Sequence, residues 1–282
     1  MLQSRLSLGM LILSCPLILA QTIPIQTAPE MTKEPINVYD GFETSTLSRI
    51  WMTVALAPES VSTQSDIVRA GHSALRITLH SHDVFNAGLQ GDSDSERDEL
   101  VEAYPFTTRG GIPYESSWSM YLPADFPIVP VRLVVAQWLE YCRTSSLPCF
   151  NNSPVLAVRY INGVLLITQD LNHHYNVLYQ EKRDLRGHWL DLRFQVRLAP
   201  QSTGFVRAWL DGKQVVDFTG VTSNQENPGT GYTPPIFLPF KMGLYRNVMP
   251  QPMTIYLDEY RKRELGDDEL PGPKATPIAQ PQ

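Results

Sequence analysis

Hydrophobic and polar residues alternate with a period of two over much of the chain between residues 37 and 266. This period is typical of β-strands that bury one face. The clearest runs are residues 74–80, 117–122, 155–161, 192–198, 205–210 and 254–258. No amphipathic helix longer than three turns is indicated. Together these runs predict an all-β fold, a single β-sandwich of the concanavalin-like jelly-roll type.

Two dipeptides strengthen this prediction. Asn162-Gly163 and Asp211-Gly212 each follow an alternating run directly. Tight hairpins favour such pairs, because both central residues of the turn take a positive φ. We therefore expect a hairpin at each of these positions.

The ends of the chain lack the alternation. Arg5 precedes an apolar stretch that ends near Ala20, so residues 1–20 are predicted to be a secretory signal peptide. A lipoprotein cleavage at Cys15 is the alternative, but the apolar stretch continues beyond it. Residues 21–36 and 267–282 are rich in Pro, Thr and Gln and are predicted to be a linker and a flexible tail. One domain, residues 37–266, is left, and we expect it to be exported to the periplasm or the extracellular space.

Composition narrows the class of protein. The hydrophobic content of 43% and the aromatic content of 10% exclude a disordered chain. Trp51, Trp118, Trp189 and Trp209 are expected in the core, because aromatic side chains bury large areas. The formal charge of -6 disfavours a nucleic-acid partner, which requires a basic face. An anionic sugar polymer held by a few local cations remains compatible with this charge.

Two cysteines follow the predicted signal peptide, Cys142 and Cys149. In an oxidising compartment they most simply form a disulfide around a short surface loop. A metal site or a redox pair is the alternative, and no Cys-x-x-Cys spacing supports it.

Candidate chemistry lies on the strand faces that point away from the predicted core. Alternation places five polar side chains there: Arg97 and Glu99 in residues 95–101, Gln137 in residues 134–140, and Lys241 and Tyr245 in residues 239–246. They offer a guanidinium, a carboxylate, a primary amide, an ammonium and a phenol. Gly243 stands between Lys241 and Tyr245, where it leaves room for something to approach the sheet.

The segments ERDEL (96–100), QW (137–138) and FKMGLYR (240–246) occur in this order on an all-β chain. They resemble the three motifs of jelly-roll polysaccharide lyases, which are R-(S/T)-E-L, Q-x-H and Y-F-K-x-G-x-Y in alginate lyases. The similarity also extends to heparin-lyase-I-like and glucuronan-lyase-like relatives and covers about residues 38–262.

The resemblance implies β-elimination at a uronic acid. By this resemblance Arg97 and Gln137 hold the substrate carboxylate, and Tyr245 donates a proton to the leaving sugar oxygen. Lys241, Glu99 and Arg246 are assigned to substrate binding. A phenol ordinarily keeps its proton at neutral pH. Tyr245 could therefore also act as the base only with nearby cations, and Lys241 and Arg246 are the candidates.

The sequence departs from the lyase motifs at two positions. Leu139 stands where alginate lyases have the histidine of Q-x-H, and Pro239 stands where the last motif has its first tyrosine. His80 and His82, on one face of the strand before Arg97, could supply the missing base, as an upstream histidine does in some glucuronan-lyase-like relatives. His82 is favoured because it lies nearer the loop 83–95. Without a base, the chain would be a noncatalytic carbohydrate-binding jelly roll.

A separate set of carboxylates could hold a metal. Asp40, Glu43 and Asp258 resemble the acidic residues on the terminal strands of jelly-roll carbohydrate proteins that bind structural calcium. Ca²⁺ takes six to eight oxygen ligands, and carbonyls of residues 69–72 could complete such a set. No organic cofactor is expected.

The function predicted from the sequence is therefore a secreted, monomeric polysaccharide lyase acting on an unsulfated polyuronate such as glucuronan or an alginate-like chain. The acidic charge weighs against heparin, because a densely sulfated chain demands many more cations. A glycoside hydrolase of the same shape would need two facing carboxylates. No E-x-D-x-x-E strand offers them, and neither nucleic acid nor a membrane is expected as a partner.

Overall fold

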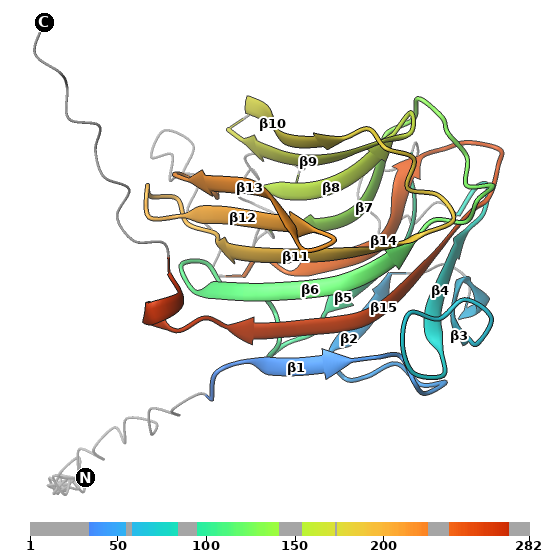
Figure 1. Cartoon of the computed structure of the whole chain (residues 1–282), viewed down its shortest axis with the longest axis horizontal. Helices are drawn as coiled ribbons and strands as arrows, with labels where there is room; N and C mark the ends of the chain where they lie inside the picture. The colour runs from blue at the N-terminus through green and yellow to red at the C-terminus, as the bar shows by residue number, and fades with distance from the viewer. Residues whose placement is uncertain are drawn as a thin grey trace, which may run out of the picture. The chain divides into compact units, whose positions relative to one another are not determined.

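Two antiparallel β-sheets are stacked face to face in the computed structural model of the chain (Figure 1). The structure describes residues 34–54, 58–83, 95–140, 154–172, 174–224 and 237–270, and Pro35–Gln282 form one compact unit. The helices in the described residues are two short 3-10 turns, Pro58–Ser60 and Asp267–Glu269. The expected all-β sandwich is confirmed.

The eight-stranded sheet runs in the order β13-β12-β11-β6-β15-β4-β3, and β1 pairs with β15 beside this path. Its strands are β1 (Asn37–Asp40), β3 (Val61–Gln64), β4 (Ala74–Leu79), β6 (Pro113–Tyr121), β11 (Trp189–Arg197), β12 (Phe205–Leu210), β13 (Lys213–Thr219) and β15 (Met253–Glu264).

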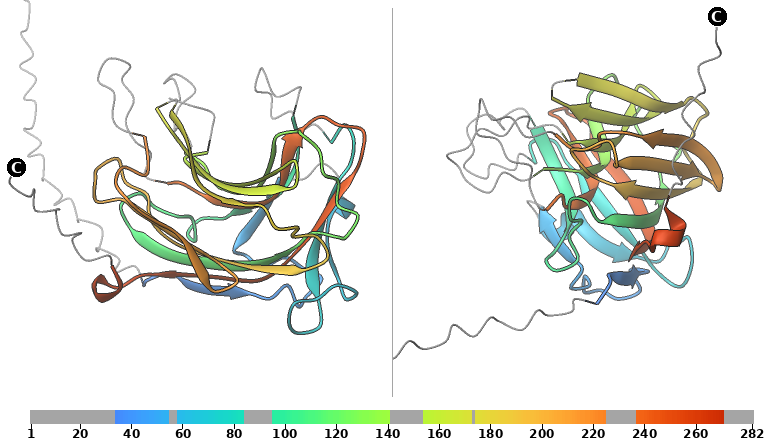
Figure 2. Two further views of the ribbon diagram at one scale, coloured as in Figure 1. Left: turned by 45° about the horizontal axis from the view of Figure 1, so that its top comes forward. Right: turned by 90° about the vertical axis from the view of Figure 1, so that its left-hand side faces the viewer.

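The seven-stranded sheet runs in the order β10-β9-β8-β7-β14-β5-β2. Its strands are β2 (Trp51–Val54), β5 (Ser95–Glu102), β7 (Leu133–Trp138), β8 (Leu156–Ile161), β9 (Val164–Leu171), β10 (His174–Glu181) and β14 (Phe240–Asn247). Both sheets bend in the same direction, and the outer face of the seven-stranded sheet lies on the inside of the bend (Figure 2). The candidate chemistry lies on this face.

Both predicted hairpins are present. Asn162 and Gly163 have φ of 53° and 82° and join β8 to β9, and Asp211 and Gly212 have φ of 48° and 77° and join β12 to β13. Two successive positive φ angles are the geometry that Asn-Gly and Asp-Gly pairs favour. The local sequence thus determines both turns.

Four aromatic rings fill the centre of the sandwich. Trp118 and Phe194 come from the eight-stranded sheet, and Trp138 and Phe240 come from the seven-stranded sheet. The centroid of the Trp118 ring lies 5.5 Å from that of Phe194 and 5.0 Å from that of Phe240. Each buried ring removes about 150–250 Å² of surface from water, so this cluster holds the two sheets together.

Two of the tryptophans expected in the core lie elsewhere. Trp51 and Trp118 are buried, but Trp189 and Trp209 are half-buried. Trp209 directly precedes Leu210 and follows Ala208, both of which are in the core. Alternation therefore turns the Trp209 ring to the outer face of the eight-stranded sheet.

The described residues refine the expected domain boundaries. Ile36 is buried and its carbonyl accepts a hydrogen bond from the Glu264 amide at 2.8 Å. Asp267–Glu269 form a 3-10 turn rather than a flexible tail, and the Glu269 carboxylate pairs with Arg263 at 2.6 Å. The predicted signal peptide and the Cys142–Cys149 disulfide lie outside the described residues and stay predictions. No helix in the described part is long and apolar enough to cross a membrane.

Candidate active site

Strand β14 brings the three motif segments together. It lies between β5 and β7 in the seven-stranded sheet. The register pairs Tyr245 with Arg97, Gly243 with Glu99, and Lys241 with Gln137. Since paired residues of neighbouring strands point to the same face, these side chains form one surface. Five of the residues predicted from the sequence therefore gather in one place.

Gly243 is required by the packing of the strands themselves. Its φ is 144°, and a Cβ built on it would lie 2.3 Å from the carbonyl oxygen of Asp98 and 2.7 Å from the Cα of Glu99. The expectation that this glycine leaves room for a ligand is therefore corrected, because the backbone of β5 occupies that space. The close approach fixes Tyr245 relative to Arg97.

Two guanidinium groups contact the ring of Tyr245. The Cζ atoms of Arg97 and Arg132 each lie 4.2 Å from the ring centroid. Arg132 precedes β7 and is oriented by Asn247 Oδ1 at 2.9 Å and Ser95 Oγ at 3.1 Å. A cation held against an aromatic face is attracted by it, so the half-buried phenol is fixed in a positively charged setting. Arg132 was not expected from the sequence.

Gln137 and Glu99 are joined directly. The Gln137 Nε2 donates to Glu99 Oε1 at 2.5 Å, and both side chains are buried. Lys241, on the neighbouring strand, is only 3% exposed. The negative charge of Glu99 would repel the carboxylate of an acidic substrate. We therefore assign Glu99 to orienting the Gln137 amide rather than to binding substrate.

The polar surface continues across β8, β9 and β10. Arg159 is buried, donates from Nε to Thr168 Oγ1 at 3.1 Å, and has its Cζ 5.8 Å from the ring of Tyr175. Burial lowers the pKa of Arg159 from its ordinary value. A signal for Arg159 is present in the sequence, since alternation places it opposite the core residues Val158 and Tyr160. It was missed because it lies outside the three motifs.

Arg246 does not belong to this surface. It alternates with Tyr245 on β14 and is fully buried, with its Nε 2.7 Å from Glu96 Oε2. A second nitrogen donates to the carbonyl of Gln251 at 2.7 Å. The predicted role of Arg246 in substrate binding is therefore wrong, and so is its predicted position beside the phenol. Arg97 and Arg132 hold that position.

His80 and His82 lie on a turn after β4 rather than on one face of a strand. His80 Nδ1 is 3.3 Å from Asp83 Oδ2, and His82 has a φ of 68°. The turn is fastened to the start of β5, where the His82 amide donates to Glu96 and the Asp83 carbonyl accepts from the Arg97 amide at 3.1 Å. The backbone of this turn is thus held beside Glu96 and Arg97 at the start of β5.

The carboxylates expected to bind calcium accept hydrogen bonds from protein N–H groups. Asp40 accepts from the Phe42 amide and from Trp51 Nε1, and Glu43 accepts from the His72 amide. Asp258 accepts from three amides, those of Arg69, Ala70 and Glu259.

Burial raises the pKa of Asp40 and of Asp258 from the ordinary value. No group of three metal-ligating side chains occurs within the described residues. Calcium binding by Asp40, Glu43 and Asp258 stays a prediction.

Solved structures share this fold. The endo-beta-1,4-glucuronan lyase from the fungus Trichoderma reesei matches with a TM-score of 0.57 and 19% identity, covering 73% of this chain and 87% of that one. Cellulose induced protein, Cip1, matches with a TM-score of 0.52 and 11% identity, covering 80% and 96%. At these identities the likeness concerns the fold alone. A comparison with curated proteins gives no match.

A family model described as polysaccharide lyase matches residues 41–261. This match covers most of the chain and includes all three strands that carry the motif residues, β5, β7 and β14. The surface around Tyr245, which combines a phenol with guanidinium groups and a primary amide, lies within the matched residues. The chain belongs to the polysaccharide lyase family, and its substrate is a polysaccharide.

Proposed function

We propose that this protein is a secreted lyase that cleaves a uronic-acid-containing polysaccharide by β-elimination, with Tyr245 as the acid. The observation that carries the proposal is the position of Tyr245 between two guanidinium groups, with Gln137 on the neighbouring strand. Export is proposed from the apolar N-terminal pattern alone.

Each group has a role in the reaction. Arg97 and Gln137 bind the carboxylate of the uronate, so that negative charge can develop on it when the neighbouring C5 proton is removed. The electron pair of the C5–H bond forms the C4–C5 double bond, the C4–O4 bond breaks, and the leaving O4 receives a proton from Tyr245. We assign the removal of the C5 proton to His82, on the turn fastened beside Arg97.

The charges on this surface favour an unsulfated polyuronate. Arg97, Arg132, Arg159 and Lys241 supply positive charge, and Glu99 and Asp170 lie on the same face of the sheet. A surface that carries both positive and negative side chains is suited to binding a polymer with only one carboxylate on each sugar. A densely sulfated chain would meet repulsion from the two acidic side chains.

The proposal is tested with purified protein and a panel of glucuronan, alginate and polygalacturonate. Cleavage creates an unsaturated product, and its ultraviolet absorbance measures the rate. Tyr245→Phe is expected to reduce the rate about 100-fold or more, because general acid catalysis contributes about 10²–10⁴-fold. The matched control is Tyr256→Phe, on β15 of the other sheet, which should leave the rate unchanged.

Two outcomes contradict the proposal. Absence of absorbance on every polyuronate would reject the reaction, and full activity of Tyr245→Phe would reject the assigned acid. His82→Ala tests the base in the same assay: a loss of turnover with intact binding supports the assignment, and full activity transfers the role to Tyr245 itself.

A further inference from the structure

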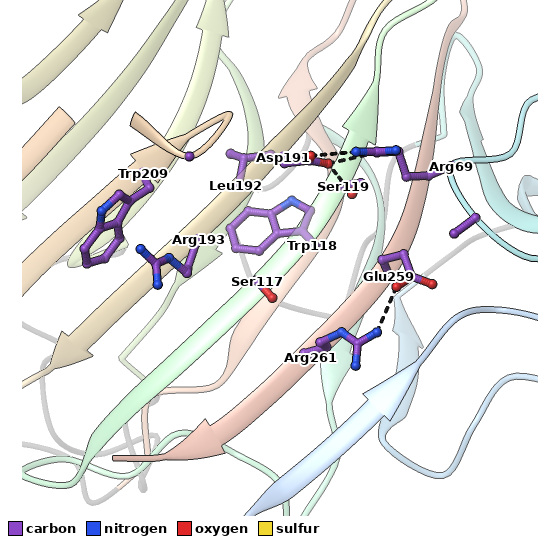
Figure 3. A pocket seen from close by; sticks show the side chains of 12 residues that line it. Arg69, Ser117, Trp118, Ser119, Asp191, Leu192, Arg193, Trp209, Glu259 and Arg261 are labelled. Carbon is purple, nitrogen blue, oxygen red and sulfur yellow. Dashed lines mark hydrogen bonds and ion pairs between the residues drawn. The ribbon is translucent and has the colours of Figure 1, made fainter. Parts of the chain in front are cut away.

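A cavity of about 450 Å³ lies on the outer face of the eight-stranded sheet, and none of the residues around Tyr245 lines it. Figure 3 shows Trp209, Arg193, Ser117 and Arg261 across its floor and Arg69 at its rim. The cavity is therefore a second feature, on the sheet opposite the proposed active site. Its volume is in the range of about 300–1,000 Å³ that is usual for ligand sites.

The floor of the cavity is one row of residues across neighbouring strands. The register pairs Trp209 with Arg193, Arg193 with Ser117, Ser117 with Arg261, and Arg261 with Tyr39. Arg193 Cζ lies 3.9 Å from the Trp209 ring, and Arg261 Cζ lies 4.2 Å from the Tyr39 ring. Two arginine–aromatic pairs thus lie on either side of Ser117. Because the serine side chain is short, a hollow is left between the two pairs.

One wall is held in place by a loop. The Arg69 and Ala70 amides donate to Asp258, and the Arg69 guanidinium binds both carboxylate oxygens of Asp191 at 3.0 and 2.8 Å. Ser119 also donates to Asp191, at 2.7 Å. The hydrogen bond from Arg69 lowers the pKa of Asp191. This wall therefore presents a fixed carboxylate and a fixed guanidinium.

The opposite wall contains a residue with unusual backbone geometry. Glu259 has a φ of 54° at the register shift of β15, and its carboxylate accepts from the Tyr39 hydroxyl at 2.6 Å and from Arg261 at 2.9 Å. A positive φ at a residue other than glycine is uncommon and clusters at functional sites. The shift turns Glu259 toward the cavity.

These groups match a sugar acid. Carboxylates and serine hydroxyls bond sugar hydroxyls, and guanidinium groups held against aromatic rings bind sugar carboxylates in bidentate fashion. Arg193 and Arg261 are separated by one intervening strand, about 10 Å across the sheet. They can therefore meet acidic groups on one extended chain.

We propose that this cavity is a second polysaccharide-binding site, which holds an acidic segment of the polymer away from the proposed active site. The identity of the polymer rests on the proposed function. Two sites on one protein raise its retention on a long chain, because the second contact forms at high effective concentration. The site contributes to binding of polymer and leaves cleavage of short oligosaccharides unaffected.

The test measures retention of Tyr245→Phe protein in affinity gels that contain glucuronan, alginate, polygalacturonate or the neutral polymer hydroxyethyl cellulose. Adding Trp209→Ala or Arg193→Ala is expected to weaken retention on an acidic polymer about fivefold or more, as expected for the loss of an arginine–aromatic pair with its ligand contacts. Ser117→Tyr, which fills the hollow and removes no charge, should do the same. Arg76→Ala, at the one exposed position of β4 in the same sheet, is the matched control for charge.

The retention results test the second site independently of the proposed lyase activity. Unchanged retention in the three cavity variants, or absence of retention before they are made, overturns the second site. An equal loss on the neutral polymer overturns its preference for acidic chains. If the wild-type protein cleaves no polyuronate but Trp209→Ala weakens retention, the second site is supported and the lyase proposal fails. Melting temperatures confirm that each variant is folded.

Discussion

Arg132 lies just before β7, its guanidinium contacts the ring of Tyr245, and the same group donates to Asn247 Oδ1 and Ser95 Oγ. This arrangement gives a guanidinium a fixed place beside the proposed acid. A cation–π contact contributes about 0.5–2 kcal/mol, with the larger value where water is excluded. Arg132→Ala is therefore expected to lower kcat/KM on a polyuronate about 2–30-fold, with a smaller loss for Arg132→Lys.

The control for Arg132 is Arg183→Ala, which removes an exposed guanidinium paired with Glu181 and Asp211. It should leave kcat/KM unchanged. If Arg132→Ala and Arg183→Ala give the same rate, the contact with Tyr245 has no part in the reaction. Thermal melting of both variants separates a loss of activity from a loss of folded protein.

Arg132 and Arg246 show what the sequence could predict of the site. Arg246 was assigned to the site because it follows Tyr245 directly, yet alternation alone turns it to the buried side. Arg132 precedes its strand, so no alternation places it, and only the pairing of β7 with β14 brings it to the phenol. The face of a residue within a strand was predictable, whereas the position of a residue outside the strands, such as Arg132, was not.

At the scale of the strand, Gly243 controls how closely β14 and β5 approach. A methyl group there would meet the backbone of β5 at 2.3 Å, where no side-chain rotation can relieve the contact. Gly243→Ala is therefore expected to lower the free energy of unfolding by more than about 2 kcal/mol. Denaturant unfolding followed by tryptophan fluorescence measures the loss.

Gly212→Ala is a matched control for this change. Gly212 also has a positive φ, 77°, but a Cβ there would have no neighbour within 4 Å. Gly212→Ala therefore carries only the cost of a left-handed backbone, about 1–2 kcal/mol. Equal losses in the two variants would show that the β14–β5 approach is not tight, and a selective loss at Gly243 is the expected result.

The alternating pattern predicted the buried strands better than the edge strands. Residues 155–161 and 205–210 were expected as strands, and β8 and β12 occupy nearly the same positions. By contrast β10 is exposed over its first four residues, and it lies at the edge of its sheet. An edge strand that packs little against the core is under little pressure to alternate, so its sequence carries a weak signal.

At the scale of the whole molecule, a buried ion pair joins the two sheets. Glu102 on β5 of the seven-stranded sheet accepts from Lys262 on β15 of the eight-stranded sheet at 2.6 Å, and both side chains are 0% exposed. Tyr260 also donates to Glu102, at 2.8 Å. Burial raises the pKa of Tyr260 well above its ordinary value, so its hydroxyl keeps the proton that it donates.

This pair could not be predicted from the sequence. Alternation gives the face of each strand but not which strands of the two sheets lie opposite one another. Glu102 and Lys262 are separated by 160 positions in the chain. Long-range order of this kind comes from the connections between strands, which the alternating pattern does not specify.

Lys262→Met is expected to destabilise the sandwich by about 3–5 kcal/mol, because it leaves the Glu102 carboxylate buried without its cation. Lys213→Met, at the exposed start of β13, should change stability by less than about 0.5 kcal/mol. Adding Glu102→Gln to Lys262→Met removes the buried charge, so the double variant should lose less than the sum of the two single losses. Additive losses in denaturant unfolding would mean that the two side chains are not coupled.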